Sequence, residues 1–138
     1  METLEQTIIR TKADRKRLIE TQYSTVLSGY RLFPVGDPTM VTPELTEVPL
    51  ECDILATLKM QIYLDYLNDE GITEAVIGNK DGGVNSISIP GYEALIMCIK
   101  RYGSQNYIAK TAAQMTVEAA TTVEEIYAVE YVIVEPTA

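Results

Sequence analysis

Residues 50–71 read LECDILATLKMQIYLDYLNDEG and form the longest stretch of the chain with the apolar spacing of a buried helix. One face of this helix is expected to carry a stripe of large apolar side chains, namely Ile54, Leu55, Leu58, Ile62 and Tyr66. The second half of the stretch adds more apolar surface, namely Met60, Tyr63, Leu64 and Leu67. The pattern predicts a central helix that is contacted on more than one side.

Both ends of this helix are also marked in the sequence. Pro49 suits the first turn, where its missing N–H costs nothing, and Glu51 and Asp53 follow near the positive end of the helix dipole. Gly71 can take the left-handed conformation that ends a helix. We therefore expect the helix to span residues 50–71.

The composition predicts a globular domain, and the apolar and turn patterns along the chain predict a mostly helical α+β fold. The 138 residues are 46% hydrophobic and 22% charged, which is typical of one folded domain. Three to four helices are expected, together with a β-hairpin at about 75–89 and a C-terminal strand at about 126–134. The predicted organisation is an N-terminal helical arm (1–31), a proline-rich extended connector (32–49) and an acidic α+β core (50–138).

The predicted arm carries a basic cluster made of Arg10, Lys12, Arg15, Lys16 and Arg17. Residues 1–31 have six basic and four acidic side chains, whereas residues 32–138 have five basic and 16 acidic ones. The plainest interpretation of the cluster is a solvated helix face. Of the functional alternatives, an arm that docks on the acidic surface of an identical subunit fits better than a nucleic-acid contact, because no aromatic residues are interleaved with the charges.

The remaining elements follow from shorter patterns. Residues 33–49 hold four of the six prolines and are expected to form an extended surface connector. Two short β-rich runs flank the GNKDGG turn at 78–83. A second helix is expected at 90–102, ended by Gly103, and a helix is favoured over a strand at 104–120. Capping-box patterns start at Thr121 and Thr122, yet the β-branched residues that follow favour a strand.

No catalytic, cofactor or metal site is predicted. The sequence has no His, and Cys52 and Cys98 lack metal or redox spacing, so we interpret them as buried reduced thiols, with a disulfide as the alternative. The best acid–base candidates are carboxylates without a distinctive spacing, namely Asp65, Glu70 and Glu93. No apolar run reaches the roughly 18 residues of a membrane span, and no signal-type segment is seen, so a cytoplasmic or virion location is expected.

The leading functional hypothesis is a non-enzymatic protein that assembles with itself or into a larger particle, such as a phage or viral virion. Its predicted interface residues are the basic cluster together with Met60, Tyr63, Leu64 and Leu67. The alternative is an acidic binding protein or inhibitor that occupies a basic site on a macromolecular partner, because the net charge is -9. A third hypothesis is a small-ligand-binding regulator with a tyrosine-lined pocket. Nucleic acid is not expected as a partner except through the basic arm, and no membrane partner is expected.

Overall fold

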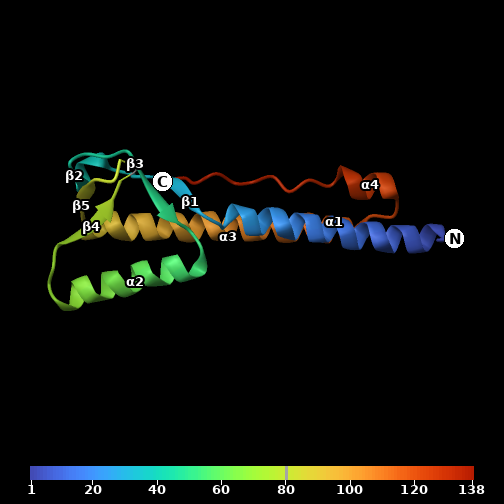
Figure 1. Cartoon of the computed structure of the whole chain (residues 1–138), viewed down its shortest axis with the longest axis horizontal. Helices are drawn as coiled ribbons and strands as arrows, with labels where there is room; N and C mark the ends of the chain where they lie inside the picture. The colour runs from blue at the N-terminus through green and yellow to red at the C-terminus, as the bar shows by residue number, and fades with distance from the viewer. Residues whose placement is uncertain (80) are drawn as a thin grey trace. The chain divides into compact units, whose positions relative to one another are not determined.

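The computed structural model describes residues 1–79 and 81–138 (Figure 1). The elements in chain order are α1 (Leu4–Val26), β1 (Tyr30–Pro34), the 3-10 turn η1 (Pro38–Met40), β2 (Val41–Thr42), β3 (Glu47–Glu51), α2 (Ile54–Asp69), β4 (Glu74–Gly78), β5 (Val84–Ser88), α3 (Ile89–Ala119) and α4 (Val123–Ala128). The predicted α+β, mostly helical class is confirmed.

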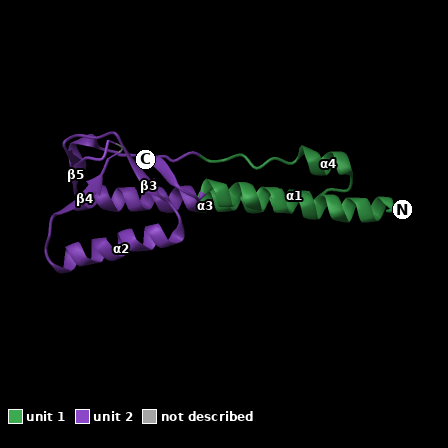
Figure 2. Cartoon of the chain, viewed as in Figure 1, with its two compact units in different colours: residues 1–26, 104–134 green, residues 27–103, 135–138 purple. Residues whose placement is uncertain are grey.

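The chain divides into two compact units (Figure 2). Unit 1 comprises residues 1–26 and 104–134, and unit 2 comprises residues 27–103 and 135–138. The division differs from the predicted arm, connector and core, because the N-terminal helix belongs with residues from the C-terminal third. The boundary inside α3 falls between Gly103 and Ser104, so this helix contributes to both units.

Unit 1 is built from α1, the second half of α3, and α4. Its core combines residues from all three helices and from the segment after α4, namely Ile19, Ala113, Val117, Ala120, Ile126 and Val129. Thr122 caps α4, because its hydroxyl accepts a hydrogen bond from the N–H of Glu125, and the Glu125 carboxylate in turn accepts one from the N–H of Thr121. The capping pattern predicted from the sequence is therefore present, and it starts a helix.

The predicted C-terminal strand at 126–134 is wrong. Its first residues belong to α4, and the residues that follow have no strand partner. The buried amide of Asn106 takes the place of a neighbouring strand, since its Nδ2 donates to the carbonyl of Val134 and its Oδ1 accepts from the N–H of Val134. The β-branched composition of this segment therefore reflects an extended conformation held by a side chain rather than by a sheet.

Unit 2 contains two small antiparallel sheets, one pairing β1 with β3 and the other ordered β2-β5-β4. The proline-rich residues 33–49, predicted to be an extended connector, supply all of β2, the end of β1 and the first part of β3. Pro34 and Pro49 fit in β1 and β3 because both strands of a two-stranded sheet are edges, where a missing N–H is tolerated. Phe33 of β1 is fully buried and meets the ring of Tyr102 edge-on, with 5.6 Å between the ring centroids.

The predicted β-hairpin is confirmed as β4 and β5. Asn79 organises the turn, because its Oδ1 accepts hydrogen bonds from the N–H groups of Asp81 and Gly83. Gly82 has a φ of 78°, a conformation that suits glycine. Lys80, which belongs to the predicted turn, lies outside the described residues.

The predicted helix end at Gly103 is wrong. The helices expected at 90–102 and 104–120 are one helix, α3, and Gly103 does not have a positive φ. A glycine inside a helix costs about 1 kcal/mol relative to alanine. The buried side chains of Tyr102 and Asn106 on either side of Gly103 outweigh this cost, since each is fixed by tertiary contacts.

A candidate assembly surface on helix α2

Helix α2 begins and ends for identifiable local reasons. The carboxylate of Asp53 accepts a 2.7 Å hydrogen bond from the N–H of Ala56 and caps the first turn. Pro49 and Glu51 were expected in that first turn, but both belong to β3. At the other end Gly71 has a φ of 66°, which confirms the predicted left-handed ending.

The face of α2 predicted to be an interface packs against unit 2 itself. Leu67 is only 2% exposed, and Met60, Tyr63 and Leu64 are half-buried. The ring of Tyr63 meets that of Tyr92 edge-on at 5.7 Å. The ring of Tyr63 therefore joins α2 to α3 and its hydroxyl joins α2 to β4, whereas the interface role of the four residues stays a prediction.

Tyr63 also protects the edge of the sheet. Its hydroxyl accepts a 3.1 Å hydrogen bond from the N–H of Val76, which lies in the edge strand β4. Unpaired N–H groups on an edge strand are sites for unwanted pairing with other chains.

Burial raises the pKa of the neighbouring Tyr92 to about 12, so this phenol stays neutral at physiological pH.

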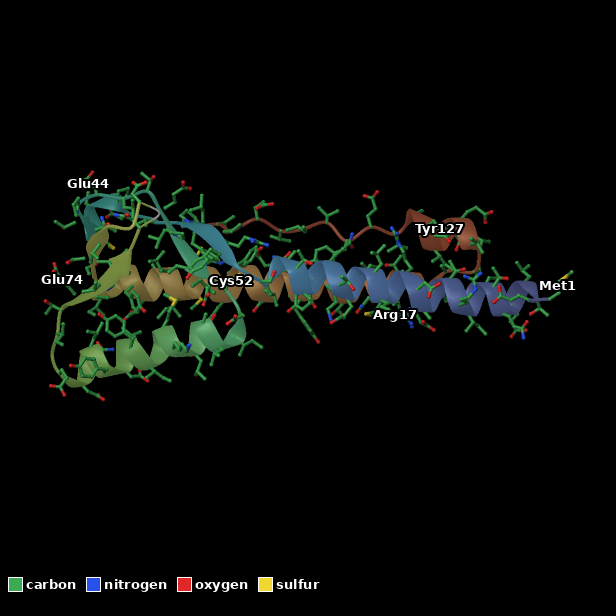
Figure 3. All side chains as sticks on the ribbon, viewed as in Figure 1. Met1, Arg17, Glu44, Cys52, Glu74 and Tyr127 are labelled. Carbon is green, nitrogen blue, oxygen red and sulfur yellow. The ribbon has the colours of Figure 1, made fainter. Side chains whose placement is uncertain are left out.

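The opposite face of α2 is apolar and exposed. We define the α2 stripe as the five side chains that were expected in the core, namely Ile54, Leu55, Leu58, Ile62 and Tyr66. They are between 49% and 84% exposed. Figure 3 shows side chains projecting from both sides of α2. The predicted helical periodicity is thus present. The α2 stripe, however, faces outward, because the opposite face of the helix, which carries Tyr63, contacts Tyr92 and β4.

Charged side chains accompany the stripe along α2. Lys59 lies near the middle of the helix, whereas Asp65 and Asp69 lie in its second half, and all three are exposed. The last turn contains no basic residue. The helix therefore presents an apolar stripe with a cation near its centre and anions toward its C-terminal end.

The basic cluster on α1 has partners within unit 1. The guanidinium of Arg10 pairs with Glu2 at 3.1 Å and holds the pKa of that carboxyl below its usual value. Lys16 pairs with Glu118 at 2.8 Å, and Lys12 donates to the main-chain carbonyl of the same residue at 2.7 Å. The contacts of the two lysines join α1 to the C-terminal part of α3.

The two remaining basic residues, Arg15 and Arg17, also contact groups of unit 1. Arg15 donates a 2.6 Å hydrogen bond to the carbonyl of Val129, and Arg17, labelled in Figure 3, lies 3.4 Å from a carboxylate oxygen of Asp14. Lys12 and Arg15 thus contact main-chain carbonyls, and the carboxylates that pair with Arg10, Lys16 and Arg17 belong to unit 1. The role of the basic cluster in self-assembly stays a prediction, and the proposal below does not rest on it.

Unit 2 also contains an apolar pocket of about 250 Å³, lined among others by Val35, Met40, Pro90 and Leu95. Its ionisable side chain is Asp37, whose carboxylate accepts hydrogen bonds from the N–H and the hydroxyl of Thr39, which lower its pKa. No tyrosine lines this pocket. The hypothesis of a tyrosine-lined ligand site therefore gains no support from it.

The thiols and carboxylates were the remaining candidates for chemistry. Cys52 (Figure 3) and Cys98 are buried thiols that form no disulfide with each other, as predicted, and burial raises the pKa of both thiols. Asp65, Glu70 and Glu93 are all exposed. Within residues 1–79 and 81–138, no group of three or more Cys, Asp or Glu side chains is placed to hold a metal ion.

No helix in the described part of the chain is long and apolar enough to cross a membrane.

Comparisons of the chain with protein-family models, with curated proteins and with solved structures found no match.

Proposed function

We propose that this chain is a non-enzymatic, self-assembling protein and that the α2 stripe is its assembly surface. The observation that carries the proposal is the exposure of five large apolar side chains on one face of one helix. Single exposed apolar residues are normal, but a contiguous exposed patch marks an interaction site. A structural component of a larger particle, such as a virion, is the context that we propose for such assembly, and the cytoplasm or the particle itself is the proposed location.

The size of the stripe indicates how strong the assembly should be. Its five residues together expose the equivalent of about three complete large side chains, and burying each contributes about 1.5–3 kcal/mol, or roughly 5–9 kcal/mol per copy. Two copies would gain roughly 9–18 kcal/mol, against a cost of about 4–15 kcal/mol for association. The midpoints of these two ranges leave a net gain of about 4 kcal/mol, which corresponds to a dissociation constant of about 1 mM.

Charge provides an independent test of this surface. Each copy has a net charge of -9, so two copies repel each other, and salt screens that repulsion. Assembly through the apolar stripe should therefore persist or strengthen as salt is added. Assembly through the basic cluster would weaken, and so would capture of a basic partner by an acidic binding protein.

The experiment measures the mass of the chain by light scattering and sedimentation from about 10 µM to about 1 mM, the range set by the expected affinity. The test variant replaces Leu58 and Ile62 with Glu, which should weaken assembly at least about 100-fold by removing roughly 3 kcal/mol or more of burial. The matched control replaces Ile108 and Met115, which are 65% and 68% exposed on α3, with Glu. Circular dichroism checks that both variants are folded.

The proposal fails if the wild-type chain stays monomeric throughout the concentration range. It also fails if the control pair, rather than the Leu58 and Ile62 pair, abolishes assembly, because the assembly surface would then lie on α3. A loss of mass at high salt would point to an ionic interface instead of the apolar stripe.

A further inference from the structure

Four of the five residues of the α2 stripe are placed symmetrically along the helix, and the fifth, Leu55, has Asp65 at its symmetry-related position. Ile54 and Tyr66 are equally distant in sequence from position 60, and so are Leu58 and Ile62. If two α2 helices run antiparallel with a two-fold axis at position 60, each of these residues meets another stripe residue. Ile54 then faces Tyr66 of the second copy.

We infer that the partner of the stripe is the same stripe of a second copy, paired antiparallel about a two-fold axis near position 60. This inference rests on the proposed function and adds the partner and its orientation. An isologous contact of this kind closes on itself and gives a dimer rather than an open chain.

The charges along α2 distinguish the antiparallel arrangement from the parallel one. In a parallel pair Lys59 would lie beside Lys59 of the other copy, and Asp65 and Asp69 would each lie beside their own equivalents. Like charges placed together at an interface oppose association. In the antiparallel pair the acidic ends lie far apart, and Lys59 falls one helical turn from Asp65 of the second copy.

The helix dipoles favour the same arrangement. The C-terminal end of α2 carries Asp69 and Glu70 but no basic residue, so its negative dipole end is not neutralised by its own side chains. A parallel pair would place two such ends together. An antiparallel pair separates them by the length of the helix, which is about 24 Å for 16 residues.

Disulfide trapping tests the arrangement. Two variants, Ile54→Cys and Tyr66→Cys, are prepared in a Cys52→Ala, Cys98→Ala background, and each is oxidised alone and as an equal mixture. Two copies of residue 54 would be about 18 Å apart along the antiparallel pair, beyond the roughly 7 Å limit for the Cα atoms of a disulfide. We therefore expect a disulfide-linked dimer in the mixture and its loss in each variant alone.

The outcomes separate this inference from the proposed function. A dimer that is trapped by Ile54→Cys alone would be parallel, which overturns the inference and leaves self-assembly through the stripe intact. A dimer in which no stripe position is trapped would use another surface and overturns both. The background chain, measured by light scattering before oxidation, shows whether a dimer forms at all, and a monomer at every concentration again overturns both.

Discussion

The C-terminal segment of unit 1 should detach when Asn106 is replaced by Ala. Asn106 is fully buried, and its amide Nδ2 donates a 2.9 Å hydrogen bond to the carbonyl of Val134. Its Oδ1 accepts a 3.0 Å bond from the N–H of the same residue and a 2.9 Å bond from the hydroxyl of Tyr131. One side chain thus fixes both the main chain and a side chain of a segment that has no strand partner.

The expected cost follows from these contacts. Each hydrogen bond contributes about 0.5–1.5 kcal/mol net, so the three together contribute about 1.5–4.5 kcal/mol to the free energy of unfolding. Once detached, the segment can form hydrogen bonds to water, so the loss of free energy of unfolding does not exceed this range. Tyr131→Phe removes one of the three bonds and should cost about 1 kcal/mol.

Denaturant unfolding followed by circular dichroism measures the free energy, and hydrogen exchange measures the protection of the Val134 amide. Asn106→Ala should lose most of that protection, because the acceptor of the Val134 N–H is the deleted side chain. The matched control is Gln105→Ala, its exposed neighbour on α3. A change below about 0.5 kcal/mol, with the Val134 amide still protected, would refute the role given to Asn106.

Two further substitutions test packing in unit 2 and the course of α3. Tyr63→Phe should lower the free energy of unfolding by about 1 kcal/mol and speed hydrogen exchange of the Val76 amide, because this N–H loses its acceptor. Unchanged exchange at Val76 would contradict this. Gly91→Ala should destabilise by about 1–3 kcal/mol in thermal unfolding, since the new Cβ would lie 2.8 Å from a side-chain carbon of the buried Ile87. Gly103→Ala is its control, because a Cβ there meets no atom within 4 Å and should stabilise the helix by up to about 1 kcal/mol.

The sequence predicted elements better than it predicted their orientation. Helical spacing located α2 and the turn chemistry located the hairpin, because both depend on neighbours within a few residues. The choice between the two faces of α2 depends on Tyr92 and β4, which no local pattern specifies. Both faces are apolar, so the spacing was equally consistent with either one being buried.

What the sequence missed in the C-terminal third and at the basic cluster has the same origin, namely contacts between residues far apart in sequence. The β-branched run before Pro136 has the composition of a strand, but a strand needs a neighbour, and here Asn106 occupies that place. No local pattern shows the contacts of Lys12 and Lys16, because their partner Glu118 lies about 100 residues away in sequence. The burial of Asn106 is seen only in the structure, and a buried amide of this kind requires hydrogen-bond partners.

The exposed stripe and the acidic charge of the chain have opposing effects. An apolar face of five large side chains favours association with many surfaces, whereas a net charge of -9 on every copy disfavours close packing of many copies. An antiparallel pair of α2 helices covers the stripe with the fewest copies and separates the acidic helix ends. A closed dimer is therefore the smallest assembly that satisfies both requirements, and any larger particle would have to be built from such dimers through surfaces other than the stripe.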